Sequence, residues 1–300
     1  MKLLSQGHGI ATHLAAVTAT KISQLAKGTL LLLALLAPAG HTLADTQSTD
    51  ASSSALHTHK QRVYLRDSVT GVAVNQSELT RQANQFVDVY FVEGWGQQRQ
   101  IALTFDDGPS QYTSAILDIL DRHQAKASFF WMGNKIAANH AIVTRALQAG
   151  HTVANHSWSH PHGAALSAKQ LWQQQIAPTN QALAKVTGDQ PAFYRPPFGE
   201  ISDEQVLMLA QKGMRTVLWS VDTRDWDEQA ITAKHISQTV ISQAHPEMIA
   251  LMHDDGGNRS ATVQALPVII EHYQALGYQL VSLDTLLKAP QPTGSAVASD

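Results

Sequence analysis

Two adjacent carboxylates stand at the end of an apolar run in the first half of the chain. Asp106 and Asp107 follow the run 101–105 and precede a Gly-Pro break, a pattern that predicts a buried strand delivering both acids to a loop. Neighbouring residues at a strand end point in different directions, so one carboxylate could bind a metal ion while the other accepts a proton. An Asp-Gly turn with capping carboxylates would explain the same residues, and the pair therefore needs support from elsewhere in the sequence.

Two histidines supply a second set of candidate ligands. His156 and His160 are four residues apart, a spacing that predicts a shared face of a helical turn and two imidazole nitrogens near one ion. The chain has 15 histidines, so a pair at this spacing also arises by chance. With a strand-end Asp, however, the pair would complete a His/His/Asp triad, an arrangement found in hydrolytic metal sites that keep coordination positions open.

Three further segments place polar residues after strand-like apolar runs. Arg195 precedes two prolines and could hold a carboxylate bidentately, residues 222–226 form an acidic loop with a Trp, and His253 ends the alternating run 249–252. Taken singly, they are explained by a surface Arg beside a rigid turn, a solvated loop and a structural His. Their joint occurrence at successive strand ends favours one site, because parallel barrels carry their active sites at the C-terminal ends of the strands.

Composition and charge exclude several classes of site. With 44% hydrophobic residues among 300, the chain can bury a sizeable core. The net charge of −3 and the lack of a Lys/Arg run leave no basic footprint for nucleic acid or a membrane surface, so no nucleic-acid partner is expected. Because the sequence has no cysteine, disulfides, thiolate catalysis and Cys-based metal sites are excluded. His and carboxylate side chains are then the remaining strong metal ligands.

From Gln100 onward, strand-like and helix-like segments alternate. The predicted strands are 101–105, 127–132, 152–154, 192–194, 215–220, 248–252 and 279–282, and the predicted helices are 113–123, 137–148, 167–186, 203–211, 231–242 and 261–275. This alternation predicts an α/β protein with a parallel sheet, and about seven strands favour a (β/α) barrel over an open doubly wound sheet.

The first 44 residues have the pattern of a secretory signal peptide. Lys21 and Lys27 precede a short apolar run, 30–37, and small residues then lead to Ala44, where cleavage is expected. The run is too short to span a bilayer, so we expect no stable membrane insertion after cleavage. The sequence therefore predicts an exported protein, periplasmic or extracellular.

Three other segments are expected to lie beside the main domain, 99–288. Residues 45–62 are rich in Ser, Thr, Asp and His and predict a disordered linker. Residues 63–98 are expected to form a short N-terminal extension with short extended stretches, notably 86–92. The Pro/Ser/Ala-rich segment 289–300 predicts a disordered tail.

Five motifs, read in order, resemble those of the polysaccharide deacetylases, the NodB-homology family also called carbohydrate esterase family 4. They are TFDDGP at 104–109, HSWSH at 156–160, RPPFG at 195–199, DTRDW at 222–226 and IALMH at 249–253. The resemblance covers roughly residues 100–287, and no position expected to carry chemistry departs from the family pattern. It implies a distorted (β/α) barrel, which agrees with the alternation of elements.

The resemblance implies separate roles for the ligands and the base. Asp107, His156 and His160 would bind a divalent metal ion, with Zn²⁺ as the first candidate and Co²⁺ or Ni²⁺ as substitutes. The ion would polarise the acyl carbonyl and lower the pKa of the attacking water. Asp106 would act as general base, oriented by Arg195, because a carboxylate that donates to an ion is a weaker base.

The remaining roles concern the leaving group and the acyl group. His253 would protonate the departing amine, and Asp225 would orient it and raise its pKa. The backbone N–H of Phe198 would stabilise the oxyanion. Trp226 and Leu251 would line a small apolar acetyl pocket.

The sequence therefore predicts a metal-dependent hydrolase that releases acetate from N-acetyl groups of a β-linked N-acetylglucosamine polymer or oligomer, such as chitin, peptidoglycan or a biofilm glucosamine polymer. An O-acetyl esterase on xylan-type polysaccharide could use the same residues. A catalytically idle carbohydrate-binding domain is a second alternative, which the intact Asp106, Asp107 and His253 argue against. A phosphoesterase would need a Gly-rich loop or basic cluster that the sequence lacks.

Overall fold

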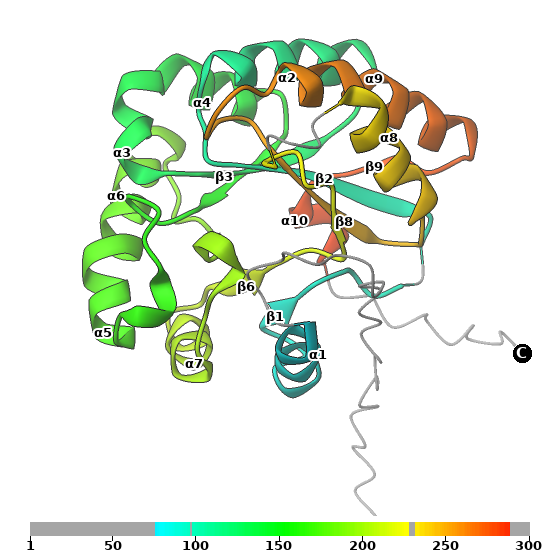
Figure 1. Cartoon of the computed structure of the whole chain (residues 1–300). Helices are drawn as coiled ribbons and strands as arrows, with labels where there is room; N and C mark the ends of the chain where they lie inside the picture. Colours follow the sequence, from blue (N-terminus) through cyan, green and yellow to red (C-terminus); the bar gives the residue numbers. More distant parts are fainter. Residues whose placement is uncertain (1–75, 97, 228–231, 289–300) are drawn as a thin grey trace, which may run out of the picture. The chain divides into compact units, whose positions relative to one another are not determined.

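The computed structural model describes residues 76–96, 98–227 and 232–288 (Figure 1). All of them belong to one of two compact units of the chain, Leu56–Asp300. The predicted signal peptide, linker and tail, and the first part of the predicted extension, lie outside the described residues. No helix within the described ranges is long and apolar enough to cross a membrane.

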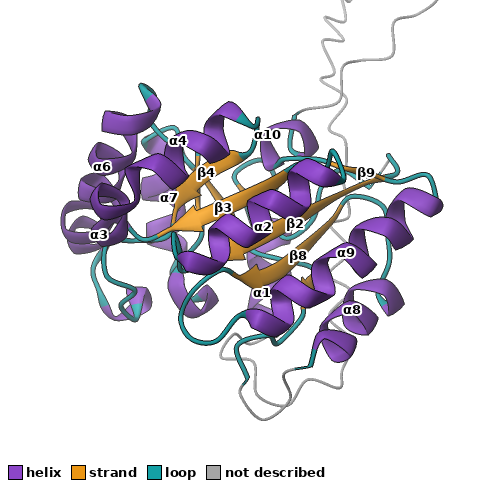
Figure 2. Ribbon diagram, turned by 90° about the horizontal axis from the view of Figure 1, so that it is seen from above, coloured by secondary structure: helices purple, strands orange, loops and turns teal. Residues whose placement is uncertain are grey.

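A curled, mainly parallel sheet forms the centre of the described unit, with helices around it (Figure 2). Its strands are β1 (Tyr90–Phe91), β2 (Gln100–Asp106), β3 (Ala127–Trp131), β4 (Thr152–Asn155), β5 (Phe193–Tyr194), β6 (Arg215–Val217), β7 (Val221–Asp222), β8 (Met248–His253) and β9 (Gln279–Leu280). They follow the order β1-β6-β5-β4-β3-β2-β8-β7, and β9 pairs with β2. Every named pair is parallel, which confirms the predicted α/β class.

The segment 215–222 brings the two ends of the sheet together. Its first part, β6, pairs with β1 and β5, and its last part, β7, pairs with β8. Between them Leu218 N–H donates to Phe91 O, and Ser220 N–H donates to Ile249 O. One continuous segment thus bonds to strands from opposite ends of the order, and the sheet curls into the distorted barrel-like form that the sequence predicts.

The helices are α1 (Gln76–Gln85), α2 (Gln111–Arg122), α3 (Gly133–Ile136), α4 (His140–Gln148), α5 (Ala168–Leu171), α6 (Ala177–Thr187), α7 (Asp203–Gln211), α8 (Ala233–Ser242), α9 (Ser260–Ala275) and α10 (Leu283–Leu286). Figure 1 shows α2, α4, α8 and α9 on one side of the strands and α1 and α7 on the opposite side. The long helix predicted at 167–186 is continuous through a π-helical turn, Trp172–Ile176, between α5 and α6. The α1 helix lies where the sequence analysis expected only extended stretches.

The central strands are buried on both faces, as parallel strands between helices must be. On β2, Leu103 and Phe105 pack with Phe129 against the outer helices, whereas Ala102 belongs with Phe130 to a second core on the other face. Burying one Phe side chain contributes about 1.5–3 kcal/mol. This two-sided burial holds the strand ends rigidly, and it is these ends that carry the polar residues.

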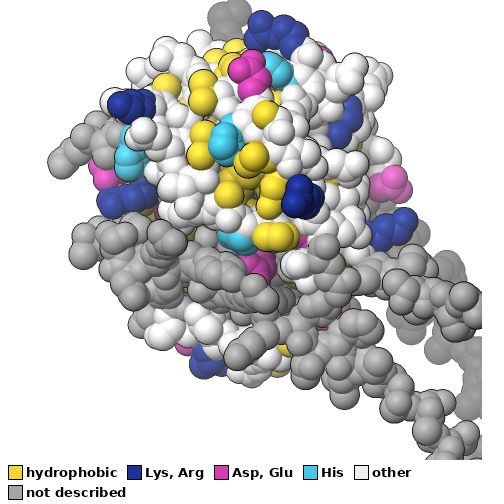
Figure 3. Space-filling model, turned by 90° about the vertical axis from the view of Figure 1, so that its right-hand side faces the viewer, with side chains coloured by type: hydrophobic (Ala, Val, Ile, Leu, Met, Phe, Trp, Pro, Cys, Tyr) yellow, Lys and Arg dark blue, Asp and Glu magenta, His cyan; other side chains and the backbone are white. Residues whose placement is uncertain are grey.

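Local signals in the sequence set where the flanking helices begin. Ser110 caps α2 through a capping box with Thr113, and Ser202 caps α7 in the same way with Gln205. On the face of the molecule seen in Figure 3, hydrophobic side chains gather in one group, and acidic, basic and histidine side chains are spread around it. Charges of both signs are therefore interspersed on this face, in keeping with the small net charge.

Candidate active site

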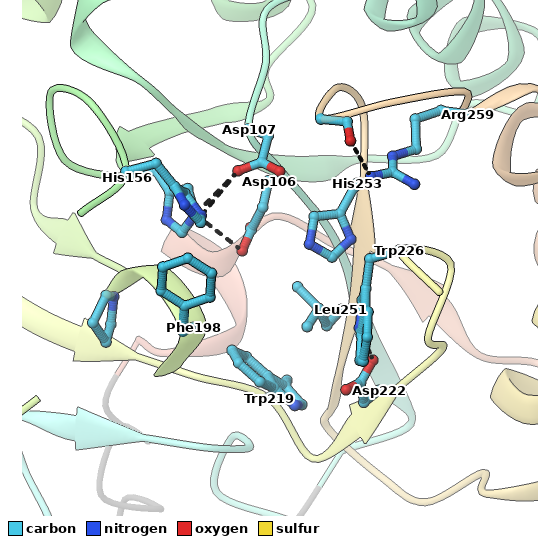
Figure 4. Close-up of a pocket in the computed structure, with 13 residues that line it drawn as sticks. Asp106, Asp107, His156, Phe198, Trp219, Asp222, Trp226, Leu251, His253 and Arg259 are labelled. Carbon is cyan, nitrogen blue, oxygen red and sulfur yellow. Dashed lines mark hydrogen bonds and ion pairs between the residues drawn. The ribbon is translucent and has the colours of Figure 1, made fainter. Parts of the chain in front are cut away.

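The C-terminal ends of several strands surround a cavity of about 350 Å³ (Figure 4). Its lining comprises Asp106, Asp107, His156, His160, Pro196, Phe198, Trp219, Asp222, Trp226, Leu251, His253, Gly256 and Arg259. Every predicted site residue except Arg195 and Asp225 lines this cavity. Those two side chains are fully buried and bond to residues of the lining.

The adjacent aspartates both approach His156, but their other partners differ: Asp106 bonds to Arg195, whereas Asp107 lies beside His160. Asp106 is the last residue of β2, and its main chain still bonds to the neighbouring strand segment, where Asp254 N–H donates to Asp106 O. Asp107 has a left-handed backbone, φ 77°, which turns the chain out of the strand. Lys135 holds this turn by donating from Nζ to Asp107 O at 2.8 Å.

Asp107 faces the two histidines. Its Oδ1 lies 3.3 Å from His160 Nε2 and 3.5 Å from His156 Nε2, and the three ligand atoms lie within 4.8 Å of one another. Ligands about 2.1 Å from a tetrahedral zinc ion are about 3.4 Å apart, so these separations suit one ion. Asp107 Oδ1 is buried and accepts no hydrogen bond from a described residue. The group therefore fits a divalent cation in its donor types, its spacing and its unsatisfied oxygen.

The histidines converge through a loop, so the prediction that they share a face of a helical turn is wrong. Ser157 and His160 both have left-handed backbones, φ 68° and 59°. Asn155 Oδ1 accepts from Ser157 N–H at 2.8 Å, and Ser157 Oγ accepts from His160 N–H at 2.9 Å. These bonds from side chains to backbone replace helical hydrogen bonds and fold the loop back.

Both histidines can turn a ring nitrogen towards a shared ion. His156 Nδ1 lies 2.8 Å from Arg195 O, a carbonyl that can only accept, so Nδ1 carries a proton and Nε2, which faces Asp107, is the nitrogen left to bind a cation. Burial lowers the pKa of His160 to about 4, which leaves it neutral at pH 7. Burial alone would raise the pKa of Asp107, but the surrounding imidazoles hold it below its ordinary range.

Asp106 is paired with a buried arginine. Arg195 Nη1 donates to Asp106 Oδ1 at 2.7 Å and to Thr104 Oγ1 at 2.8 Å. The rest of the guanidinium donates to Val217 O and Leu218 O and stacks 4.0 Å from the centre of the Phe130 ring. Burial lowers the pKa of Arg195, and Asp106 opposes that change. The carboxylate is thus fixed from behind, with Oδ2 towards His156 at 3.7 Å.

His253 forms a second acid–base pair on the opposite side of the cavity. Its Nδ1 lies 2.7 Å from Asp225 Oδ1, while Asp225 Oδ2 accepts from His253 N–H at 2.8 Å and from Thr262 Oγ1 at 2.7 Å. Burial acts to lower the pKa of His253, but the Asp225 carboxylate outweighs it and raises that pKa to about 9. Asp225 itself, despite burial, keeps a lowered pKa because of His253. His253 is therefore protonated at neutral pH.

The predicted acyl-side residues line the remaining wall. Leu251 is the register partner of Asp222 across β7 and β8, and Trp226 Nε1 donates to Asp222 Oδ1 at 3.3 Å. Phe198 has a left-handed backbone, φ 58°, in the turn Pro197–Gly199. Its amide stands at the start of this turn, where N–H groups lack partners within the turn.

Sequence reasoning missed three residues of the lining. Trp219 lies just before the DTRDW motif, inside a segment read only as a strand. Arg259 donates to Asp225 O at 2.7 Å and to Asp255 O at 2.6 Å, joining two loops. At Gly256, a Cβ would lie 2.5 Å from Asp107 Oδ2. In the sequence, a Gly-Gly pair at 256–257 and the single Arg259 soon after His253 were the features that could have indicated these residues.

Known proteins resemble this chain. A family model described as polysaccharide deacetylase matches residues 94–217. A peptidoglycan-N-acetylglucosamine deacetylase of Bacillus cereus is 35% identical over 201 residues, 66% of this chain and 72% of that protein. The peptidoglycan-N-acetylmuramic acid deacetylase PdaC of Bacillus subtilis is 37% identical over 190 residues, 63% of this chain and 39% of that protein. The crystal structure of a peptidoglycan N-acetylglucosamine deacetylase has a TM-score of 0.65 at 34% identity, with 69% of this chain and 97% of that one covered.

Proposed function

The chain belongs to the polysaccharide deacetylase family, and on that premise we propose that it hydrolyses N-acetyl groups of a β-linked N-acetylglucosamine polymer and releases acetate. One observation carries the proposal. A ligand triad (Asp107, His156 and His160) and a protonated imidazole (His253) line one cavity, with Asp106 beside the triad. Amide hydrolysis needs these parts together: activation of water and carbonyl, a base, and an acid for the leaving amine.

The triad would hold a divalent cation, with Zn²⁺ proposed first because two imidazoles and one carboxylate are typical zinc ligands. When bound, the cation would polarise the acyl carbonyl and make water a better nucleophile. The chain's own contribution is to hold the three ligand atoms close together with no hydrogen-bond donor from a described residue on Asp107 Oδ1.

Asp106 would remove the proton from the attacking water. Its Oδ1 is occupied by Arg195, so the second oxygen is the one left to accept a proton. Arg195 also prevents the carboxylate from rotating, because its guanidinium is fixed to two main-chain carbonyls. General-base catalysis of this kind contributes on the order of 10²–10⁴ in rate.

His253 would donate a proton to the nitrogen as the C–N bond breaks. The raised pKa keeps the imidazolium form available at neutral pH, and Asp225 holds the ring by Nδ1, which leaves Nε2 to act as the donor. The Phe198 amide would bind the oxyanion that develops on the acyl oxygen. Trp226 and Leu251 would enclose the acyl group.

Two similar proteins are named for peptidoglycan amino sugars, which supports peptidoglycan as the first substrate to test. We further propose that the protein acts outside the cytoplasm, because residues 1–44 have the pattern of a secretory signal peptide. Sequencing the N-terminus of the mature protein tests that placement, with Asp45 expected as the first residue.

Acetate release from a panel of polymers tests the activity. The panel comprises chito-oligosaccharides, N-acetylated peptidoglycan, poly-N-acetylglucosamine and acetylxylan, each with added Zn²⁺ or Co²⁺ and with chelator. We expect release from an N-acetylated polymer, lost with chelator and in Asp106→Asn. Release from acetylxylan alone would establish an O-acetyl esterase instead, and saccharide binding without release from any polymer would establish an idle binding domain.

A further inference from the structure

A fully buried carboxylate follows the proposed general acid in the chain and has no part in the mechanism described above. Asp254 comes directly after His253 at the end of β8, and its side chain does not line the cavity. Its partners are neutral donors: Gly108 N–H donates to Oδ1 at 3.0 Å, while Thr113 Oγ1 and Trp131 Nε1 donate to Oδ2 at 2.5 and 3.0 Å. Burial raises the pKa of Asp254 to about 7, against the effect of these hydrogen bonds. Burying a carboxylate is costly, so its presence here calls for a reason.

Asp254 bonds to the chain on both sides of the proposed ligand Asp107. On one side its N–H donates to Asp106 O at 3.0 Å. On the other side its carboxylate accepts from Gly108 N–H, and its carbonyl accepts from Ser110 Oγ. Asp107 lies between these contacts with its left-handed backbone. The turn that presents the ligand is therefore fixed at both of its neighbours.

The contact between Asp254 and Gly108 leaves no room for a side chain at the glycine. A Cβ placed on Gly108 would collide with both carboxylate oxygens of Asp254. Thr113 is fitted to the same carboxylate, because its Oγ1 accepts from Ser110 N–H at 2.8 Å and its own hydrogen is then free for Asp254 Oδ2. The glycine and the threonine are thus both accounted for by their packing against Asp254.

The metal site depends on where this turn places Asp107. Its Oδ1 has to lie near both imidazoles, as it does at 3.5 Å from His156 Nε2 and 3.3 Å from His160 Nε2. Residues that orient a metal ligand are worth a large part of the affinity, because a displaced donor atom no longer fits the ion.

We propose that Asp254 is a positioning residue of the metal site: through Gly108, its carboxylate holds the turn in which Asp107 faces the two histidines. The inference rests on the proposed function, in which this triad binds a divalent cation. A carboxylate that served only to stabilise the start of α2 would leave the affinity for the ion unchanged, so metal affinity separates the two roles.

A matched pair of substitutions in the full-length, metal-free protein tests the proposal. Asp254→Asn keeps the size of the side chain, but its NH₂ group must face at least one of the present donors. Glu247→Gln is the control, because Glu247 is also buried, precedes the opposite end of β8 and accepts from Gly96 and Gln98 N–H at 2.6 and 3.0 Å. The dissociation constant for Zn²⁺ is measured by competition with a chelating dye, and the Tm of each metal-free protein is recorded.

We expect Asp254→Asn to raise the dissociation constant by on the order of 10–100-fold and Glu247→Gln to leave it unchanged, although both substitutions should lower the Tm. Thr113→Val, which removes one donor to Asp254 and keeps the shape of the side chain, serves if Asp254→Asn does not fold. For that variant we expect an increase of on the order of fivefold, the effect of one lost hydrogen bond.

The other outcomes are distinct from one another. An unchanged dissociation constant in Asp254→Asn, or in Thr113→Val if that variant has to be used, would overturn the proposal. An equal increase in Asp254→Asn and Glu247→Gln would also overturn it, because the effect would then follow from lost stability. A wild type that binds no Zn²⁺ would contradict the proposed metal site itself.

Discussion

The two walls of the cavity differ in whether their buried polar atoms have hydrogen-bond partners. On the wall of Asp107, His156 and His160, the facing atoms are a carboxylate oxygen and two imidazole nitrogens, and the buried Asp107 Oδ1 accepts no hydrogen bond from a described residue. On the wall of His253 and Asp225, both carboxylate oxygens accept hydrogen bonds at 2.7–2.8 Å.

This difference separates the side chains whose role depends on a bound cation from those whose role does not. Buried acceptors that face one another without donors are costly, and we propose that a positive ion completes the first wall. The second wall carries its own cation, the His253 imidazolium, and its own anion. We therefore expect substitutions on the first wall to act through metal affinity and substitutions on the second wall to act through proton transfer.

The largest effect is expected from removing a histidine ligand. His156→Ala or His160→Ala leaves two protein ligands of three, so tight metal binding and turnover should both be abolished. Elemental analysis and acetate release measure the two quantities, and His235→Ala, an exposed histidine on α8, is the control. Full metal occupancy in either ligand variant would contradict the assignment.

The paired aspartates should respond differently to the same substitution. Asp106→Asn should keep the metal and lose on the order of 10²–10⁴ in kcat, because an amide cannot accept the proton. Asp107→Asn should weaken metal affinity, which a competition titration with a chelating dye reports. If Asp106→Asn lost the metal while Asp107→Asn retained it, the two roles would be exchanged.

His253→Ala should reduce hydrolysis of an amide far more than hydrolysis of an aryl ester. An amide's amine must be protonated as it departs, whereas an aryl alkoxide leaves with little help. We expect a loss on the order of 10²–10⁴ on a chito-oligosaccharide and a much smaller loss on an aryl acetate. Equal losses on both substrates would remove the role of His253 as the general acid.

Asp225→Asn should move the pH dependence more than the maximal rate. In the proposed mechanism the imidazolium of His253 is the active form, so activity should be present below its pKa and lost as the pH rises through it. Asp225 raises that pKa to about 9 against the effect of burial, and a bound cation would act to lower it. Without the carboxylate, the alkaline limb of kcat/KM should move down towards or below the ordinary value of about 6.5. A limb at the same pH in both proteins would show that Asp225 does not set it.

The order of elements and the strand-end positions of the site were predictable from the sequence. Both rest on local patterns: the alternation in 101–105 specifies β2, and the Ser202 cap before an apolar repeat specifies α7, which matches its predicted bounds. Parallel strands share one C-terminal edge. Residues that follow different strands can therefore be predicted to lie close together even when their contacts are not known.

The parts that were not predictable depend on contacts between distant residues. The left-handed turns at Ser157 and His160 depend on hydrogen bonds from the Asn155 and Ser157 side chains, which spacing alone does not reveal. Arg259 acts on Asp225, 34 residues away in the chain, and nothing in its local sequence marks that contact. Trp219 lines the cavity, but in the sequence it is only one apolar residue of a strand-like segment.

A metal titration of the metal-free protein tests whether activity depends on one ion bound by Asp107, His156 and His160. The chelated protein is titrated with Zn²⁺ while bound metal and acetate release from an N-acetylated oligomer are measured in the same samples, with His156→Ala alongside. We predict no release without metal, activity that rises in proportion to occupancy, and saturation at one ion per chain. Full acetate release from metal-free protein, or activity in His156→Ala equal to that of the wild type, would contradict the account.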